Sequence, residues 1–420
     1  MHPRFYRDHR VGRKAEPGEV PAKPSKAGFE TVSALLDLFE RALEQLEPAA
    51  PLVALLHSLE DSGDVDHPDR NETVGESIFR PTRSPSGGLK PLAGCIPPGR
   101  RMNILGKVAV LGAGNIGGSL AQRLAEMDLA QEVVLFDIVE GLPQGKALDI
   151  QQSAPILGFS TRVRGTTSLD DIAGADVVVE TAGLARKPGM SRSDLLEKNA
   201  SIVKGHAEAV RAKAPNAVCV VVTNPVDVMT YYFRAKSGLP APRVFGESGT
   251  LDTARFRWFV AEALNVAPRD VTGFVLGTHG DTMVPILSLT SVSGVPLTKL
   301  LPPDRLSAIV ERTKGGGAEI VNLLKTGSAF YAPTASQAEL VRAIAHDEHR
   351  LLSASTYLDG AFGERDVYIG APVVLGRSGI ERVVEVDLNP AERAAFVASV
   401  AAVRSDLAIL AKLPGPTTPG

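Results

Sequence analysis

The chain has 420 residues, of which 44% are hydrophobic and 22% are charged. This composition is typical of a soluble globular protein with two or three domains. A formal net charge of -3 gives no reason to expect nucleic acid as a partner, and no apolar run reaches the roughly 20 residues needed to cross a membrane. The amino end has no hydrophobic segment of a secretory signal, so we expect a cytoplasmic protein. Cys95 and Cys219 cannot define a disulfide framework, and the apolar run around Cys219 predicts a core residue.

Residues 1–101 differ in character from the rest of the chain. They are rich in proline and charge and show no repeating strand pattern, which is typical of a disordered segment. Residues 29–47 are the exception, because their apolar side chains recur every three or four positions and predict one amphipathic helix. We expect residues 1–101 to be a dispensable extension or an upstream start that does not belong to the chain. A regulatory or docking arm is the alternative.

From residue 107 onward, short apolar strands alternate with helical stretches. We expect strands at residues 108–111, 133–136, 177–180 and 218–222, and helices at 119–127 and 193–213. Continuous β-branched runs are typical of strands buried on both faces of a parallel sheet. The alternation therefore predicts an α/β fold, with a doubly wound Rossmann domain over residues 102–246.

After residue 246 the pattern becomes mixed. A strand is expected at residues 271–276, and several short ones between 351 and 386. Helices are expected at 251–264, 303–324 and 390–411. This order predicts an α+β catalytic domain over residues 247–414, followed by a frayed tail at 415–420.

A glycine-rich motif, Gly112-Ala113-Gly114-Asn115-Ile116-Gly117, follows the first predicted strand and opens the first helix. In that context the first glycine makes a tight turn, the second lets the backbone approach a pyrophosphate, and the third allows close packing of helix and strand. The second strand ends at Asp137, where a carboxylate accepts hydrogen bonds from a ribose diol and repels a 2′-phosphate. The motif therefore predicts NAD rather than NADP. The alternative is a purely structural glycine turn.

A histidine and an acid are candidates for proton transfer. His279 follows the predicted strand at 271–276, and its ordinary pKa of about 6.5 suits a general acid or base. Asp252 and Arg255 lie three residues apart on one face of a predicted helix. Asp252 is placed to orient the imidazole, as the acid does in hydrolase triads. The alternatives are a surface histidine and an intrahelical ion pair without further consequence.

Arg186 and Arg192 lie on a stretch punctuated by glycine and proline, which predicts a mobile loop. Arginine binds carboxylates through two parallel hydrogen bonds, so two of them predict a substrate with more than one oxygen-rich end. A solvated basic loop is the alternative. Asn224 follows another strand, where open α/β sheets bind their ligands; a helix N-cap before Pro225 is an equally physical interpretation.

These motifs, in this order, resemble the lactate/malate dehydrogenase family, and its malate branch most closely, over roughly residues 105–412. The resemblance implies that His279 exchanges the proton, with Asp252 as its partner, and that Arg255 binds the carboxylate beside the reacting carbon. It further implies that Arg192 polarises the ketone oxygen when the loop closes and that Arg186 selects the substrate.

The resemblance also implies a cofactor site, further substrate contacts and an assembly. Asn224 and Ser328 would contact substrate, a homodimer or homotetramer is expected, and no metal is expected. The implied NAD-binding residues are Gly112, Ala113, Gly114, Asn115, Ile116, Gly117, Asp137, Asn199, Val222, Thr223 and Asn224.

The choice of substrate depends mainly on Arg186. The stretch at 246–252 resembles lactate enzymes, whereas those at 315–322 and 331–336 resemble the malate branch. A cation facing the methyl group of lactate would be costly in a closed pocket, but a second carboxylate would pair with it. We therefore expect oxidation of (S)-malate to oxaloacetate with NAD, a step of the tricarboxylic acid cycle. The alternatives are an L-lactate or broad 2-hydroxyacid dehydrogenase, a catalytically silent NAD-binding scaffold, and an NAD-using glycosidase, for which no metal-ligating pair is evident.

Overall fold

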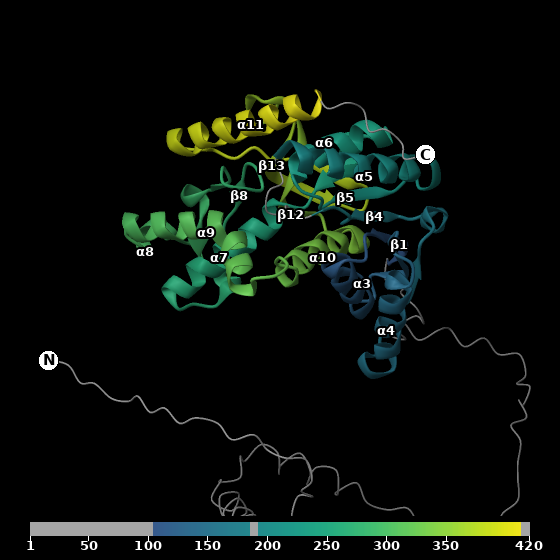
Figure 1. Ribbon diagram of the computed structural model, residues 1–420. Coiled ribbons are helices and arrows are strands. Elements are labelled where there is room, and N and C mark those ends of the chain that lie inside the picture. Colours follow the sequence, from purple (N-terminus) through teal and green to yellow (C-terminus); the bar gives the residue numbers. More distant parts are fainter. Residues whose placement is uncertain (1–103, 185–191, 413–420) are drawn as a thin grey trace, which may run out of the picture. The chain divides into compact units, whose positions relative to one another are not determined.

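A computed structural model describes residues 104–184 and 192–412, and one nine-stranded sheet runs through this part of the chain (Figure 1). The strand order is β14-β13-β12-β6-β5-β4-β1-β2-β3. Six strands are parallel: β1 Leu105–Leu111, β2 Ala130–Phe136, β3 Arg162–Thr166, β4 Val177–Glu180, β5 Val218–Val221 and β6 Val244–Gly246. Their order is that of a doubly wound dinucleotide-binding sheet, so the predicted fold class is confirmed.

Helices cover both faces of this sheet. In Figure 1, α5, α6 and α11 lie on one face, and α3, α4 and α10 on the other. Along β1, Val108 and Val110 pack into one core while Ala109 and Leu111 pack into the other, as expected for a strand buried on both sides. The helices are α3 Asn115–Glu126, α4 Leu142–Leu157, α5 Arg192–Lys213, α6 Val226–Ser237, α7 Gly249–Leu264, α8 Leu297–Leu300, α9 Pro303–Leu324, α10 Tyr331–His346 and α11 Pro390–Leu410.

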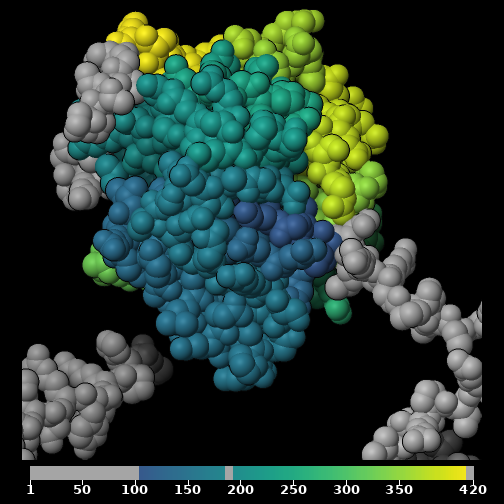
Figure 2. All heavy atoms as spheres, turned by 90° about the vertical axis from the view of Figure 1, so that its right-hand side faces the viewer, coloured from purple at the N-terminus to yellow at the C-terminus, as the bar shows by residue number. Residues whose placement is uncertain are grey.

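The second half of the chain extends the sheet. Strands β12 (Arg350–Asp359), β13 (Arg365–Gly376) and β14 (Gly379–Val383) form an antiparallel meander, and β12 pairs with β6 through Ser355 and Gly246. Figure 2 shows the blue residues, which begin the described part of the chain, and the teal segment after them as one closely packed surface, with yellow residues from near the C-terminus along its edge.

A third core lies away from the sheet, where α7 and α9 pack on several two-residue strands. The single strand expected at residues 271–276 is wrong. Gly273 and Phe274 belong to no strand, and Gly273 passes close to Thr290, since a Cβ there would lie 2.8 Å from Thr290 Oγ1. Two strands therefore form, and they belong to different sheets. The short strands are β7 Val271–Thr272, β8 Val275–Leu276, β9 Val284–Pro285, β10 Ser291–Val292 and β11 Val295–Pro296.

Several other expectations can be compared with the structure. Cys219 is fully buried in the core, as predicted. Among the described helices, none combines the length and apolar character needed to span a membrane. The predicted helix at residues 29–47, the rest of residues 1–101, Cys95 and the tail at 415–420 lie outside the described residues.

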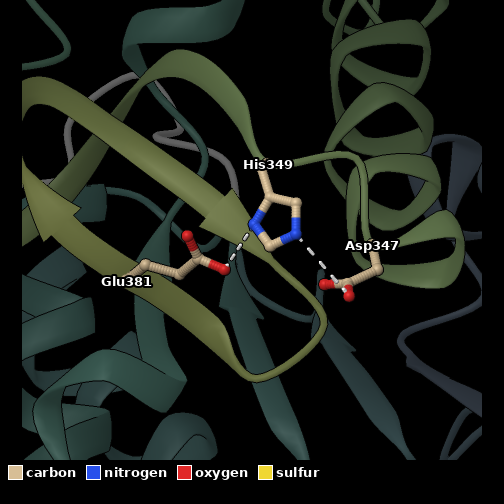
Figure 3. A group of neighbouring side chains, drawn as sticks. All are labelled: Asp347, His349 and Glu381. Carbon is tan, nitrogen blue, oxygen red and sulfur yellow. Dashed lines mark hydrogen bonds and ion pairs between the residues drawn. The ribbon is translucent and has the colours of Figure 1, made fainter.

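An exposed cluster joins the end of α10 to the hairpin of β13 and β14 (Figure 3). The two ring nitrogens of His349 face different carboxylates: Nδ1 lies 2.7 Å from Glu381 Oε1 and Nε2 lies 3.7 Å from Asp347 Oδ2. Asp347 Oδ1 also accepts a hydrogen bond from the backbone N–H of Arg377. The imidazole is therefore a bridge between two chain segments, and we assign the cluster a structural role.

A buried ion pair connects β4 to α5. Glu180 is fully buried at the end of β4, and His206 Nδ1 of α5 donates to its Oε2 at 2.7 Å. Burial lowers the pKa of His206. The charge of Glu180 and this hydrogen bond raise the pKa by more than burial lowers it, so the pKa lies above its ordinary value. The pair holds α5 against the carboxyl edge of the sheet.

Replacement of His206 by alanine should lower the free energy of unfolding by about 3 kcal/mol, because it leaves the Glu180 charge buried without its partner. The double variant Glu180→Gln/His206→Ala should lose less, since no charge is then stranded. Urea denaturation of the two variants and the parent protein tests this. Equal losses in the single and double variants would contradict it.

Candidate active site

Six of the predicted site residues line one cavity of about 230 Å³. Val222 and Asn224 enter it from the carboxyl end of β5, Arg255 from α7, and His279 from the segment after β8. Ligands of open α/β sheets bind at this edge because the connections after neighbouring strands leave toward opposite faces of the sheet and open a crevice there. The remaining two are Ile116 and Ser328.

His279 and Arg255, which line this cavity, both contact the buried carboxylate of Asp252. The Asp252 carboxylate is 1% exposed; its Oδ2 lies 2.8 Å from His279 Nδ1, and its Oδ1 lies 3.4 Å from Arg255 Nη1. The intrahelical ion pair and the contact with the imidazole therefore exist together. Since Nδ1 is bound to the carboxylate, Nε2 is the ring atom free to exchange a proton with a ligand.

The surroundings of His279 favour its charged form. Burial lowers the pKa of the imidazole, but the charge and hydrogen bond of Asp252 raise it by more, and the charge of Glu247 adds to this rise. The resulting pKa is about 9. Near neutral pH the ring is consequently protonated and ready to donate to an oxygen in the cavity.

Asp227 anchors the segment that carries His279, and sequence reasoning missed it. Its Oδ2 accepts from the backbone N–H of His279 at 3.2 Å, and its Oδ1 accepts from Ser355 Oγ at 2.6 Å. Burial raises the pKa of this carboxyl group to about 6. Asp227 thereby holds the backbone from which the imidazole extends.

The glycine motif has the shape that a dinucleotide requires. Gly112 has a φ of 102°, and a Cβ on Gly117 would overlap the carbonyl oxygen of Gly112. Beside Gly114 the space is open, since a Cβ there would meet nothing within 4 Å. Helix α3 begins at the next residue without a side-chain cap, so its first N–H groups are available to an anion. These features fit a bound pyrophosphate.

Asp137 and Lys146 hold the backbone of this loop in place through hydrogen bonds. Asp137 Oδ2 accepts from the backbone N–H of Ala113 at 2.7 Å, while Lys146 Nζ donates to the carbonyls of Ala113 and Gly114 at 2.7 and 2.9 Å. Asp137 thus directly follows β2 and lies beside the loop, where its prediction as a ribose acceptor requires it. No motif pointed to Lys146.

The predicted cofactor residue Asn199 is fully buried and braces the neighbouring chain segments. Its side chain accepts from the N–H of Leu184 at 2.8 Å and donates to the carbonyl of Asn224 at 2.7 Å. Thr223 Oγ1 donates to the Ala182 carbonyl. The alternative of an N-cap at Asn224 is wrong, because α6 is preceded by Pro225 at the cap position. An NAD contact by Asn199 stays a prediction.

The predicted substrate loop is largely outside the described residues. Arg186 is not among them, and the structure describes Arg192 only as the backbone of the first residue of α5. Their contacts with substrate therefore stay predictions.

Replacing Asp252 by asparagine should lower the pKa of His279 from about 9 toward its ordinary value, because burial then opposes the charged ring without the carboxylate. The ring-carbon NMR signals of His279, followed against pH, measure this directly. His206 serves as the internal control, and its titration should not change. A value that stays near 9 would mean that Asp252 is not the cause.

Residues 106–246 match the lactate/malate dehydrogenase NAD binding domain, and residues 249–412 match the lactate/malate dehydrogenase alpha/beta C-terminal domain. A curated relative, the malate dehydrogenase of Chloroherpeton thalassium, is 53% identical over 298 residues, which are 71% of this chain and 96% of the relative.

Two solved structures are similar throughout the same region. The malate dehydrogenase from Salinibacter ruber is 48% identical with a TM-score of 0.70, over 73% of this chain and 98% of that one. The lactate dehydrogenase from Cryptosporidium parvum, complexed with lactic acid and nicotinamide adenine dinucleotide, is 40% identical with a TM-score of 0.72. This match covers 74% of this chain and 99% of that one. The glycine loop, the His279–Asp252 pair and these matches agree: the chain belongs to the lactate/malate dehydrogenase family.

Proposed function

We propose that this chain catalyses the reversible oxidation of (S)-malate to oxaloacetate with NAD. The observation that carries the proposal is the buried Asp252 carboxylate, which holds His279 at 2.8 Å in the wall of a cavity that also contains Arg255. Relatives that are 53% and 48% identical and bear the name malate dehydrogenase support malate as the substrate. The family match to an NAD-binding domain supports the cofactor.

The glycine loop and Asp137 would hold the dinucleotide, with the uncapped amides of α3 toward its pyrophosphate. When bound, NAD supplies the hydride acceptor, and the protein contributes position and charge. Asp137 would accept hydrogen bonds from the adenosine ribose, which favours NAD over NADP.

His279 performs the proton transfer. During malate oxidation its Nε2 accepts the hydroxyl proton, and Asp252 stabilises the imidazolium that forms. In the opposite direction the imidazolium returns this proton to the ketone oxygen of oxaloacetate. Lys146 and Asn199 take no part in the transfer; they hold the backbone around the site.

Five residues would orient the substrate. Arg255 binds the carboxylate next to the reacting carbon, and Asn224 and Ser328 line the cavity around it. Arg192 would polarise the ketone oxygen. Arg186 would bind the distal carboxylate, which lactate lacks.

Cellular context is proposed on the family resemblance. We propose a cytoplasmic enzyme of the tricarboxylic acid cycle that forms a homodimer or homotetramer. Exposed apolar side chains on α4, namely Leu148, Ile156 and Leu157, support self-association. Residues 102–246 and 247–414 remain our proposed NAD-binding and catalytic domains.

The two reaction directions should depend on pH in opposite ways. Since the pKa of His279 is about 9, kcat for malate oxidation at saturating substrate should rise with pH up to that region, because the base must be neutral. For oxaloacetate reduction, kcat should fall there. NADH absorbance from pH 6 to 10 tests this.

His279→Asn should lower kcat in both directions by about 10²–10⁴-fold; a variant that keeps full activity would refute the assigned role.

Arg186→Gln should lower kcat/KM for oxaloacetate far more than for pyruvate, because it removes only the partner of the distal carboxylate. A loss of about 100-fold would be in keeping with a charged hydrogen bond of 1.5–3 kcal/mol. Measuring both keto acids with the parent and variant enzymes tests this. Equal losses would remove Arg186 as the selector, and a parent enzyme that prefers pyruvate would favour the lactate alternative.

A further inference from the structure

Glu247 is a buried acid in the substrate cavity with no role so far. It directly follows β6 and is 4% exposed. It lines the same cavity as His279, Arg255 and Asn224. Its backbone N–H donates to the Val221 carbonyl at 2.8 Å, so the main chain at this position is held by the neighbouring strand. The carboxyl group is consequently a fixed part of the cavity wall.

Few groups compensate the charge of this carboxylate. Among the side chains that the structure describes, the Ser336 hydroxyl of α10 is the one that bonds to it. Arg255 and His279 both face Asp252, and α9 contributes uncharged Gly317 and Val321 to the cavity. An ionised Glu247 would therefore add a second negative charge to the site.

The charged groups around Glu247 act in opposite directions. Burial raises its pKa, as does the charge of Asp252 on α7. The charges of His279 and Arg255 and the hydrogen bond from Ser336 lower it. The balance is a pKa of about 7, so the group changes its charge close to physiological pH.

We propose that Glu247 controls substrate binding by its protonation state: the protonated acid admits a carboxylate substrate, and the ionised acid repels it. This inference rests on the proposed function of the same cavity. The carboxylates of oxaloacetate are ionised throughout the neutral range, and in a cavity of about 230 Å³ they cannot avoid the Glu247 charge. Substrate binding is thereby coupled to the uptake of one proton by Glu247.

The test is the KM for oxaloacetate between pH 6 and 8, a range below the pKa of about 9 of His279. In the parent enzyme KM should rise with pH through about 7, by about tenfold, the factor that corresponds to one pKa unit of interaction. In Glu247→Gln, which is neutral at every pH, KM should stay constant across this range. A KM that rises equally in the variant would overturn the proposal, as would a loss confined to kcat.

Two further variants separate charge from structure. Ser336→Ala removes a hydrogen bond that favours the ionised acid, so the rise in KM should move to higher pH. Glu262→Gln, an exposed acid on α7 paired with Arg312, is the matched control and should reproduce the parent profile. If the rise in KM occurred at the same pH in Ser336→Ala as in the parent enzyme, the proposal would be contradicted.

Failure of the proposed function has a different signature. Preference of the parent enzyme for pyruvate would refute malate as the substrate. The same KM comparison with pyruvate, which carries one carboxylate, would then still test Glu247. A pH-independent KM in an enzyme active on oxaloacetate would refute the inference alone.

Discussion

The site depends on one buried carboxylate that faces two cations. Asp252 is 1% exposed, so the protein has to supply all the compensation that water would give elsewhere. Its oxygens lie near His279 and Arg255. The same charge makes the imidazole basic and orients the guanidinium, and removing it would disturb both the proton transfer and the carboxylate binding that we propose.

The fold holds this carboxylate in place by tying the start of α7 to the sheet. Thr250 Oγ1 donates to the Ser353 carbonyl of β12 at 2.7 Å, and the N–H of Val275 in β8 donates to Thr253 Oγ1 at 3.0 Å. Gly249 allows the close approach, because a Cβ there would overlap the Ser353 side chain. A shift of α7 would therefore break several bonds together.

The elements predicted from sequence were those with a strong local signal. The β-branched runs of β1, β2, β4 and β5 and the stripe of α9 are visible in the chain itself. Helix α10 was missed because it is buried on most of its surface, including the polar residues Thr334, Ser336 and Gln337, so its apolar residues do not form a distinct stripe. Helix α4 was missed because it buries little and contains Pro155. Motifs pointed to the residues to which we assign the chemistry, whereas Glu247 meets Ser336 from 89 positions away, a proximity that only folding creates.

The pairing of β12 with β6 has a consequence for how the chain folds during its synthesis. Strand β6 completes the parallel set, and its outer edge is closed by Ser355 of the second half. An exposed strand edge promotes association with other chains. In a nascent polypeptide that has been synthesised only as far as β6, this strand edge would be unpaired. It would remain so until about a hundred further residues, which form the loop between β6 and β12, have been synthesised. The sheet of the proposed NAD-binding domain is thus completed last, by a strand of the proposed catalytic domain.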